Sequence, residues 1–191
     1  MRTCSVRSFA LPLRPLAACV GLSLLAVAST SLQGGPTPPE PSDEHAWLGR
    51  MVGEWEWSLG EAFDPEAVSG TESIRGLGEL WVVSRGHANL GGTEFESQMT
   101  LGYDPDREAF VGTWVDGVQT HMWIYEGSLD EEGGMLTLDT EGPSMSDPEE
   151  TARYRDRIEW LGPNEKRMTS ELQGPDGEWV QIMSVCARRK Q

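Results

Sequence analysis

The sequence has few cysteines, few histidines and few basic residues for its length. Among 191 residues there are three cysteines and three histidines, and 15 lysines and arginines stand against 31 acidic residues. No His-x-x-x-His or Cys-x-x-Cys spacing occurs, so a metal site is not predicted. A Gly-x-Ser-x-Gly nucleophile elbow is also missing, and the glycine-rich segments begin no predicted helix, so a phosphate-binding loop is not expected.

Long apolar runs are scarce too, and the clearest one lies near the N-terminus. The run Leu16–Ala28 follows three arginines without an acidic residue and ends in Ala-Val-Ala, which is typical of a signal peptidase site. It is shorter than the roughly 20 residues that a transmembrane helix needs. We therefore predict a cleaved signal peptide over residues 1–28 and an exported protein, periplasmic or secreted. Lipid anchoring through Cys19, in the lipobox-like "LAAC", is disfavoured because the apolar run continues past that cysteine.

Removal of this leader leaves an acidic chain with a single cysteine. The formal net charge of −16 becomes −19 once the three arginines of the leader are lost. Such a surface repels phosphate backbones and anionic lipids, so we expect neither nucleic-acid partners nor stable membrane association. Since Cys186 has no partner for an internal disulfide, stability must come from a hydrophobic core.

The rest of the chain divides into a linker and one domain. Residues 29–42 are rich in proline and glycine, and residues 43–191 carry a short predicted helix around Trp47 followed by runs of alternating apolar residues. Turn signals such as "DPDR", "DG" and "GPDGE" separate these runs, which predicts about ten antiparallel strands in an all-β sandwich or barrel. The predicted strands are Trp55–Leu59, Thr71–Leu77, Leu80–Leu90, Phe95–Tyr103, Phe110–Val115, Val118–Tyr125, Met135–Asp139, Tyr154–Trp160, Arg167–Leu172 and Trp179–Ala187.

The two middle turns predict how their strands pair. If Asp104–Arg107 is a four-residue loop, Leu101 faces Phe110. If "DG" is a two-residue turn, Gly112 faces His121. A register slip of one residue in either turn would reverse part of the assignment of side chains to the two faces.

Side-chain alternation sorts these strands into two surfaces. One surface begins with Glu94 and Glu96, which would be costly to bury without partners. The other carries no acidic residue and many aromatic ones, so we predict that it faces inward. The candidate ligand-binding residues on this inward surface are Met99, Phe110, Trp114, His121, Trp123 and Tyr125.

His121 has two interpretations on that surface. It could contact a ligand, as an axial haem ligand or as a donor to a small molecule, or it could be a core histidine bonded to a neighbour or a water. Carboxylates are too numerous for any pair to be assigned to acid–base chemistry. Arg155 and Arg157 alternate with Asp156, and we predict that they point outward and pair with acidic residues. No particular cofactor is indicated.

Three segments carry a family resemblance. "HAWLGRMVGEW", "GGTEFESQMTLGYDPDREAFVGTWVDGVQT" and "GPDGEWVQIMSVCARR" resemble the bacterial family called domain of unknown function 1579, over residues 45–189. Cys186-Ala187 stands where the family pattern has Tyr-Thr, which leaves the register of the last strand open. The resemblance implies an antiparallel up-and-down β-barrel similar to lipocalins and fatty-acid-binding proteins, and it supplies no function. It rests on His45, Gly53, Trp55, Gly102, Tyr103, Asp104, Trp114, Asp116 and Arg188.

The function then depends on the barrel interior. A barrel of this kind can be filled by side chains or can hold one small ligand. We predict that this one binds a small hydrophobic or amphipathic ligand. Two alternatives stay open, namely an enzyme acting on a ligand in the same cavity and a structural or interaction protein with a filled barrel. The eight tryptophans fit any of the three, and the oligomeric state is not indicated.

Overall fold

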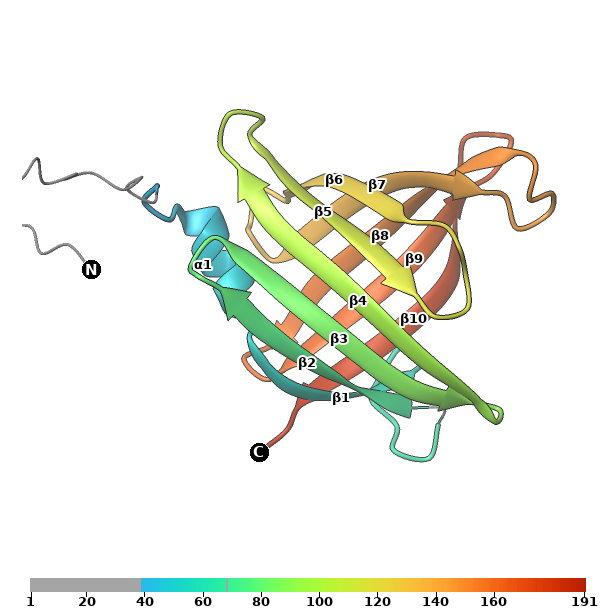
Figure 1. Cartoon of the computed structure of the whole chain (residues 1–191), viewed down its shortest axis with the longest axis horizontal. Helices are drawn as coiled ribbons and strands as arrows, with labels where there is room; N and C mark the ends of the chain where they lie inside the picture. Colours follow the sequence, from blue (N-terminus) through green and yellow to red (C-terminus); the bar gives the residue numbers. More distant parts are fainter. Residues whose placement is uncertain (1–38, 68) are drawn as a thin grey trace, which may run out of the picture. The chain divides into compact units, whose positions relative to one another are not determined.

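The computed structural model describes residues 39–67 and 69–191. The predicted signal peptide and most of the predicted linker lie outside these residues. A short helix, α1 (Asp43–Gly49), precedes ten strands (Figure 1). No helix in the described part of the chain is long and apolar enough to cross a membrane. The strands are β1 (Gly53–Leu59), β2 (Ser69–Leu77), β3 (Trp81–Leu90), β4 (Thr93–Asp104), β5 (Ala109–Asp116), β6 (Trp123–Leu129), β7 (Met135–Pro143), β8 (Thr151–Gly162), β9 (Glu165–Gln173) and β10 (Trp179–Arg189).

The strands form one closed antiparallel barrel in which each strand pairs with its neighbours in sequence. The order around the barrel is β1-β10-β9-β8-β7-β6-β5-β4-β3-β2, and β1 closes the ring by pairing with β10 (Figure 1). Closure gives every strand two partners, so the sheet presents no unpaired edge. The predicted all-β, up-and-down barrel of about ten strands with a short N-terminal helix is therefore confirmed.

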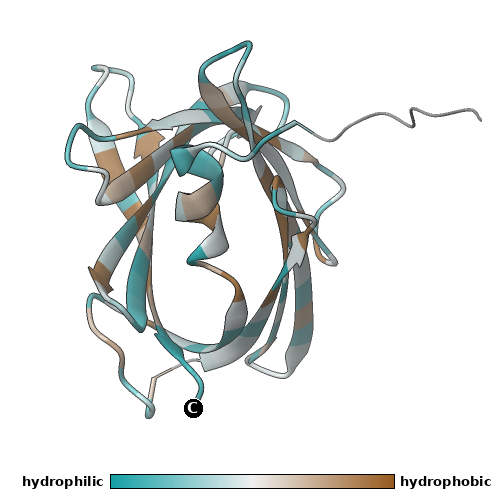
Figure 2. Ribbon diagram, turned by 90° about the vertical axis from the view of Figure 1, so that its left-hand side faces the viewer, coloured by the Kyte–Doolittle hydropathy of each residue, from teal (hydrophilic) through white to brown (hydrophobic). Residues whose placement is uncertain are grey.

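Helix α1 lies across one end of this barrel (Figure 2). Its N-terminus is capped by Ser42, whose backbone N–H donates to Nδ1 of His45 at 3.0 Å. Trp47 is buried, donates its indole N–H to the carbonyl oxygen of Gly133 at 3.0 Å and packs edge-to-face on Phe110. The helix therefore acts as a plug that is bonded to the turn between β6 and β7.

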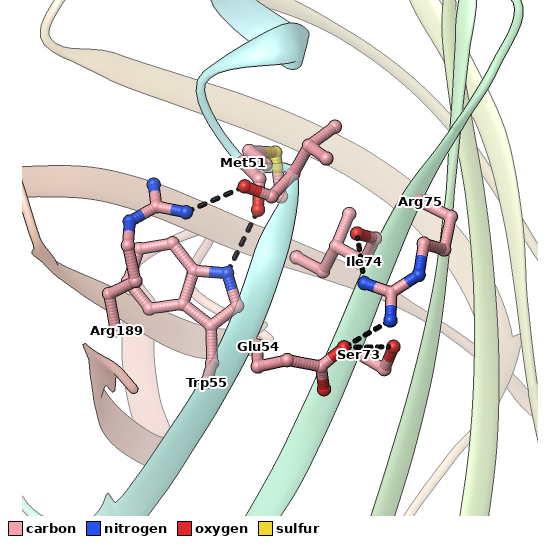
Figure 3. Close-up of polar contacts among 8 residues, drawn as sticks. Met51, Glu54, Trp55, Ser73, Ile74, Arg75 and Arg189 are labelled. Carbon is pink, nitrogen blue, oxygen red and sulfur yellow. Dashed lines mark hydrogen bonds and ion pairs between the residues drawn. The ribbon is translucent and has the colours of Figure 1, made fainter. Parts of the chain in front are cut away.

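The connection from α1 to β1 is fixed by an arginine from the last strand. Arg189 donates to the carbonyl oxygen of Val52 at 2.6 Å, and its guanidinium lies 4.3 Å from the centroid of a Trp55 ring (Figure 3). The indole N–H of Trp55 donates to the carbonyl oxygen of Met51 at 2.8 Å. Gly53 has a φ of +149°, which side-chain-bearing residues rarely adopt. Arg189 of β10 thus links the connection after α1 to the barrel wall.

The hydrophobic core fills the half of the barrel that α1 covers. Residues from α1 and from nine strands form one cluster of buried side chains, with aromatic rings packed around it. Trp47, Phe110 and Trp160 meet edge-to-face in this half. The core includes Leu48, Met51, Trp55, Ile74, Leu101, Phe110, Leu136, Leu138 and Ile158.

The predicted registers of the β4–β5 and β5–β6 pairs are both wrong, each by an even number of residues. Leu101 pairs with Gly112 rather than Phe110, a slip of two, and Gly112 pairs with Tyr125 rather than His121, a slip of four. The first turn therefore lies at residues 105–108, and residues 117–122 are outside any strand. Because side chains alternate with a period of two, even slips leave the inward face of each strand unchanged.

The wider connection between β5 and β6 has a local cause. The Oδ1 atom of Asp116 accepts from the backbone N–H groups of Val118 and Gln119, at 2.8 and 2.7 Å. These bonds satisfy the backbone beyond the strand and replace the tight two-residue hairpin that "DG" predicts. The strand predicted at 118–125 consequently begins at Trp123.

Candidate ligand-binding site

The half of the barrel away from α1 contains a cavity with two adjoining lobes. The Lys166 lobe has a volume of about 370 Å³ and includes Glu72 and Lys166 in its wall. The Asp156 lobe has a volume of about 640 Å³ and includes Tyr125 and Asp156. The lobes share part of their lining, so they form one continuous interior space. The shared residues are Met99, Trp114, Gln119, Met168 and Met183.

Methionine and tryptophan side chains supply much of the apolar lining. Met99, Met168 and Met183 come from three different strands and meet where the lobes join. Methionine is unbranched and polarisable, so its side chain adapts to ligands of different outline. Trp114 lies between the lobes and offers a flat apolar face to either. The junction therefore combines a rigid ring with adaptable side chains.

Three polar side chains of the Lys166 lobe interact with one another. Nζ of Lys166 lies 2.7 Å from Oε2 of Glu72, and Oγ of Ser84 donates to Oε1 of the same carboxylate at 2.6 Å. Burial opposes ionisation of Glu72, but the Lys166 charge and the two hydrogen bonds prevail and lower its pKa. Glu72 and Lys166 therefore form an ion pair in which the two charges compensate each other.

The Asp156 lobe contains a carboxyl group without such compensation. Oη of Tyr125 donates to Oδ2 of Asp156 at 2.6 Å, and Oγ of Ser170 donates to Oδ1 at 2.5 Å. Burial raises the pKa of Asp156 despite these two hydrogen bonds, and it also raises the pKa of Tyr125 well above its ordinary value. Within residues 39–67 and 69–191, no lysine, arginine or histidine pairs with Asp156.

Two further polar atoms of this lobe have no hydrogen-bond partner among the described residues. They are Nε1 of Trp123 and Oγ1 of Thr140, and both are buried. Thr140 is 7% exposed, and both side chains line the lobe. Buried polar atoms normally have a partner, so these two are positioned to bind a polar group within the cavity.

The wall of the Asp156 lobe includes exposed side chains, which mark its mouth. Met145, which is 71% exposed, comes from the connection between β7 and β8, while Ile182 and Met183 come from β10. The pairing of β10 with β9 is irregular between Gln181 and Met183. Such a bulge lets adjacent residues face the same side, which explains why both Ile182 and Met183 line the lobe.

Four of the six predicted site residues line this cavity. Met99 and Trp114 belong to both lobes, and Trp123 and Tyr125 belong to the Asp156 lobe. Phe110 points inward as predicted, but it is 1% exposed within the core cluster and lines neither lobe. That these residues contact a ligand stays a prediction.

The predicted position of His121 on the inner wall is wrong. His121 lies in the connection between β5 and β6, where its ring packs edge-to-face on Trp123 and its Nε2 lies 3.3 Å from the carbonyl oxygen of Glu141. It lines neither lobe, so the geometry gives no support to an axial haem ligand at this position. Among the residues that the structure describes, no group of three or more potential ligands could hold a metal ion.

Sequence reasoning missed the charged residues of the cavity. The outward direction predicted for Arg155 and Arg157 is correct, since they pair with Asp139 and Glu171. Alternation then requires Asp156 to face inward, so its position was available from the sequence. Lys166 was not identified as a cavity residue, because the predicted strand began one residue later, at Arg167.

Comparison with known proteins adds a family and a fold. A family model described as "Protein of unknown function (DUF1579)" matches residues 40–189. No curated protein matches the chain significantly. The S-type phycobiliprotein lyase CPES from Guillardia theta has a similar structure, with 17% identity and a TM-score of 0.50, over 80% of this chain and 94% of that one. A redesigned β-barrel aligns with 8% identity and a TM-score of 0.39, over 75% of this chain and 94% of its own.

Proposed function

The chain belongs to the DUF1579 family, whose description assigns no function, and we propose that it binds one small, mostly apolar ligand inside its barrel. The observation that carries this proposal is the two-lobed cavity, with adjoining volumes of about 370 and 640 Å³. Small-molecule sites typically span about 300–1,000 Å³ and combine an apolar wall with a few convergent polar groups. The likeness to the lyase concerns the fold and contributes no ligand.

The distribution of packing within the barrel supports the same proposal. Buried aliphatic and aromatic residues fill the end of the barrel beneath α1, and the cavity lies next to this core, with which it shares Met99 and Tyr125. Interiors of proteins are close-packed, and an unfilled apolar cavity lowers stability. A cavity of this size is therefore better explained by a ligand than by the alternative of a filled structural barrel.

An enzyme acting on a ligand in the same cavity is the second candidate. The observation that favours it is the Tyr125–Asp156 pair, because burial raises the pKa of both groups beside the cavity. Binding without turnover is the simpler function, since both oxygens of Asp156 are already hydrogen-bonded. Mass spectrometry of a ligand before and after incubation with the protein would reveal any conversion.

Binding can be tested with Nile red, a neutral apolar dye, and a panel of apolar competitors. We expect saturable fluorescence enhancement with one site per chain. Substituting Met183→Trp places an indole at the junction and mouth of the cavity and should weaken dye binding about tenfold or more. The matched control is Met122→Trp, since Met122 is 54% exposed and lines neither lobe.

Two results would contradict the proposal. One is the absence of saturable binding by the dye or by any member of the panel. The other is an equal effect of the two tryptophan substitutions, which would place the dye outside the cavity. Circular dichroism of both variants would show that they keep the strand content of the parent.

A further inference from the structure

The charges inside the cavity restrict the chemistry of what it can hold. The lining residues of the two lobes carry three carboxyl groups, from Glu72, Asp116 and Asp156, against the single ammonium group of Lys166. Lys166 is already paired with Glu72 at 2.7 Å. No uncompensated cation of the described wall is therefore left to receive an anionic head group, and the net charge of the interior repels one.

Asp156 stands out among these carboxyl groups because it has hydrogen bonds but no counter-charge. Asp116 is half-buried and accepts from two backbone N–H groups of its own loop, so local structure accounts for it. Asp156 is held from both sides by Tyr125 and Ser170, which fixes its direction toward the lobe that it lines. Asp156 is half-buried like Asp116, but it lines the barrel interior, where a carboxylate is normally neutralised by a proton or by a cation.

Thr140 provides a second and independent indication of a ligand at this place. Its Oγ1 is buried without a described partner, and its side chain, 7% exposed, lines the same lobe. Thr140 pairs with Tyr154 on β8, two residues from Asp156, so both side chains belong to neighbouring inward positions of the β7–β8 pair. One polar head group in the lobe could thus donate to the hydroxyl and to the carboxylate together.

Resting on the proposed function, we propose that the ligand is a cationic amphiphile, an apolar molecule whose protonated amine binds Asp156 and Thr140 in the Asp156 lobe. The ammonium supplies the missing counter-charge and donates to both acceptors. The apolar part lies among Trp114, Met99 and Met168 at the junction of the lobes. Anionic amphiphiles, such as fatty acids, meet no free cation in this wall and therefore bind more weakly.

The experiment compares three ligands with the same tail: dodecylamine, 1-dodecanol and dodecanoate. Displacement of Nile red from the full-length mature protein gives their affinities, at concentrations below aggregation. A hydrogen bond to a charged group is stronger than one between neutral groups, so we expect the amine to bind about tenfold or more tighter than the alcohol. Dodecanoate should bind more weakly than either.

Two variants separate the cavity from the acidic surface. Asp156→Asn keeps the size of the side chain and removes its charge, and it should reduce amine affinity about tenfold or more while changing alcohol affinity less than about threefold. Asp139→Asn is the matched control, because Asp139 lies on β7 with its carboxylate paired to Arg155 on the outer wall. The amine preference should also persist at raised salt, which screens exposed charges more than buried ones.

Each contrary outcome has a distinct meaning. Equal binding of amine and alcohol, tighter binding of dodecanoate, or equal effects of the two Asp→Asn variants would overturn the amine assignment while Nile red still binds. A preference that disappears in salt would also overturn it, because it would locate the amine on the surface. Failure of Nile red and all three ligands to bind would instead refute the proposed function. If Asp156→Asn does not fold, the comparison of the three ligands on the unsubstituted protein still tests the amine assignment.

Discussion

His45, one of the residues on which the family resemblance rests, supports the N-cap of α1, because its Nδ1 accepts from the backbone N–H of Ser42. Other residues of that pattern have comparable roles in turns. Gly53 adopts a positive φ, and Oδ1 of Asp104 accepts from the backbone N–H of Asp106 at 3.0 Å. Trp114 differs from these, since it lines both lobes of the cavity. At the residue scale, the family pattern therefore describes mainly how the scaffold is held, and of the charged groups that line the cavity only Asp116 belongs to it.

The Glu72–Lys166 pair gives a prediction at this scale. Substituting Lys166→Met leaves the Glu72 carboxylate in the barrel without its cation and should lower the free energy of unfolding by about 3 kcal/mol or more. Adding Glu72→Met to that variant removes the uncompensated charge and should restore most of the loss. Urea denaturation of the two single variants and the double variant completes a mutant cycle.

An exposed ion pair provides the control for that cycle. Arg75 and Glu54 pair on the outer wall, with 63% and 48% of their side-chain surface exposed (Figure 3). Arg75→Met should leave the free energy of unfolding almost unchanged, because solvent screens this pair. A loss of similar size from Lys166→Met would show that the pair inside the barrel is solvated as well.

The charged groups of the cavity also show which features can be predicted from the sequence and which cannot. Asp156 could be placed inward from its arginine neighbours, because alternation within one strand is a local property. The partnership of Glu72 with Lys166 could not be predicted, because 94 residues separate them and their strands, β2 and β9, are not adjacent. Such a contact across the interior is created by closure of the barrel, and no local pattern encodes it.

At the scale of elements, the strands followed from the sequence more readily than their connections. Alternating apolar residues identify β4 and β5, since burial on one face imposes a period of two. The length of a turn, by contrast, can depend on a single side chain. Oδ1 of Asp116 accepts from two backbone N–H groups, and these bonds widen the connection after β5. The inward face of each strand was nevertheless correct, because both register errors were even. His121, which lies in the widened connection, was misplaced for the same reason.

Helix α1 is the element whose contribution can be tested by one substitution. Trp47→Ala removes a buried ring that packs on Phe110 and Trp160 and donates to Gly133, and should cost about 3–5 kcal/mol. Trp179→Ala is the control, because the Trp179 ring lies on the outer wall. The guanidinium carbon of Arg155 lies over that ring, 4.1 Å from the ring centroid. We expect a loss of about 1 kcal/mol there.

Chemical denaturation of both variants would decide whether α1 is integral to the barrel. If Trp47→Ala costs no more than Trp179→Ala, the helix is a peripheral appendage. In that case the end of the barrel beneath it would be closed by the strands' own side chains.

At the scale of the whole molecule, export remains a proposal that rests on residues 1–28 of the sequence. Cleavage after Ala28 would leave a chain that begins at Ser29 and retains Cys186, whereas the uncleaved chain has three cysteines. Cys186 is fully buried, so we expect no reaction with a thiol reagent in the folded protein and one thiol per chain after unfolding. Intact mass of protein recovered from its native compartment checks the new terminus. Three thiols in that material would refute cleavage.

The methionines of the cavity would be open to oxidation if the protein is exported to an oxidising compartment, as proposed. Met145 and Met183 lie at the mouth, where peroxide can reach their sulfur atoms, and conversion to the sulfoxide would turn an apolar entrance into a polar one. If a ligand binds in the cavity as proposed, it would shield Met183, Met99 and Met168 from that oxidation. On that proposal, a bound ligand would protect the methionines that form its own site, and the empty protein would be the form most susceptible to oxidation.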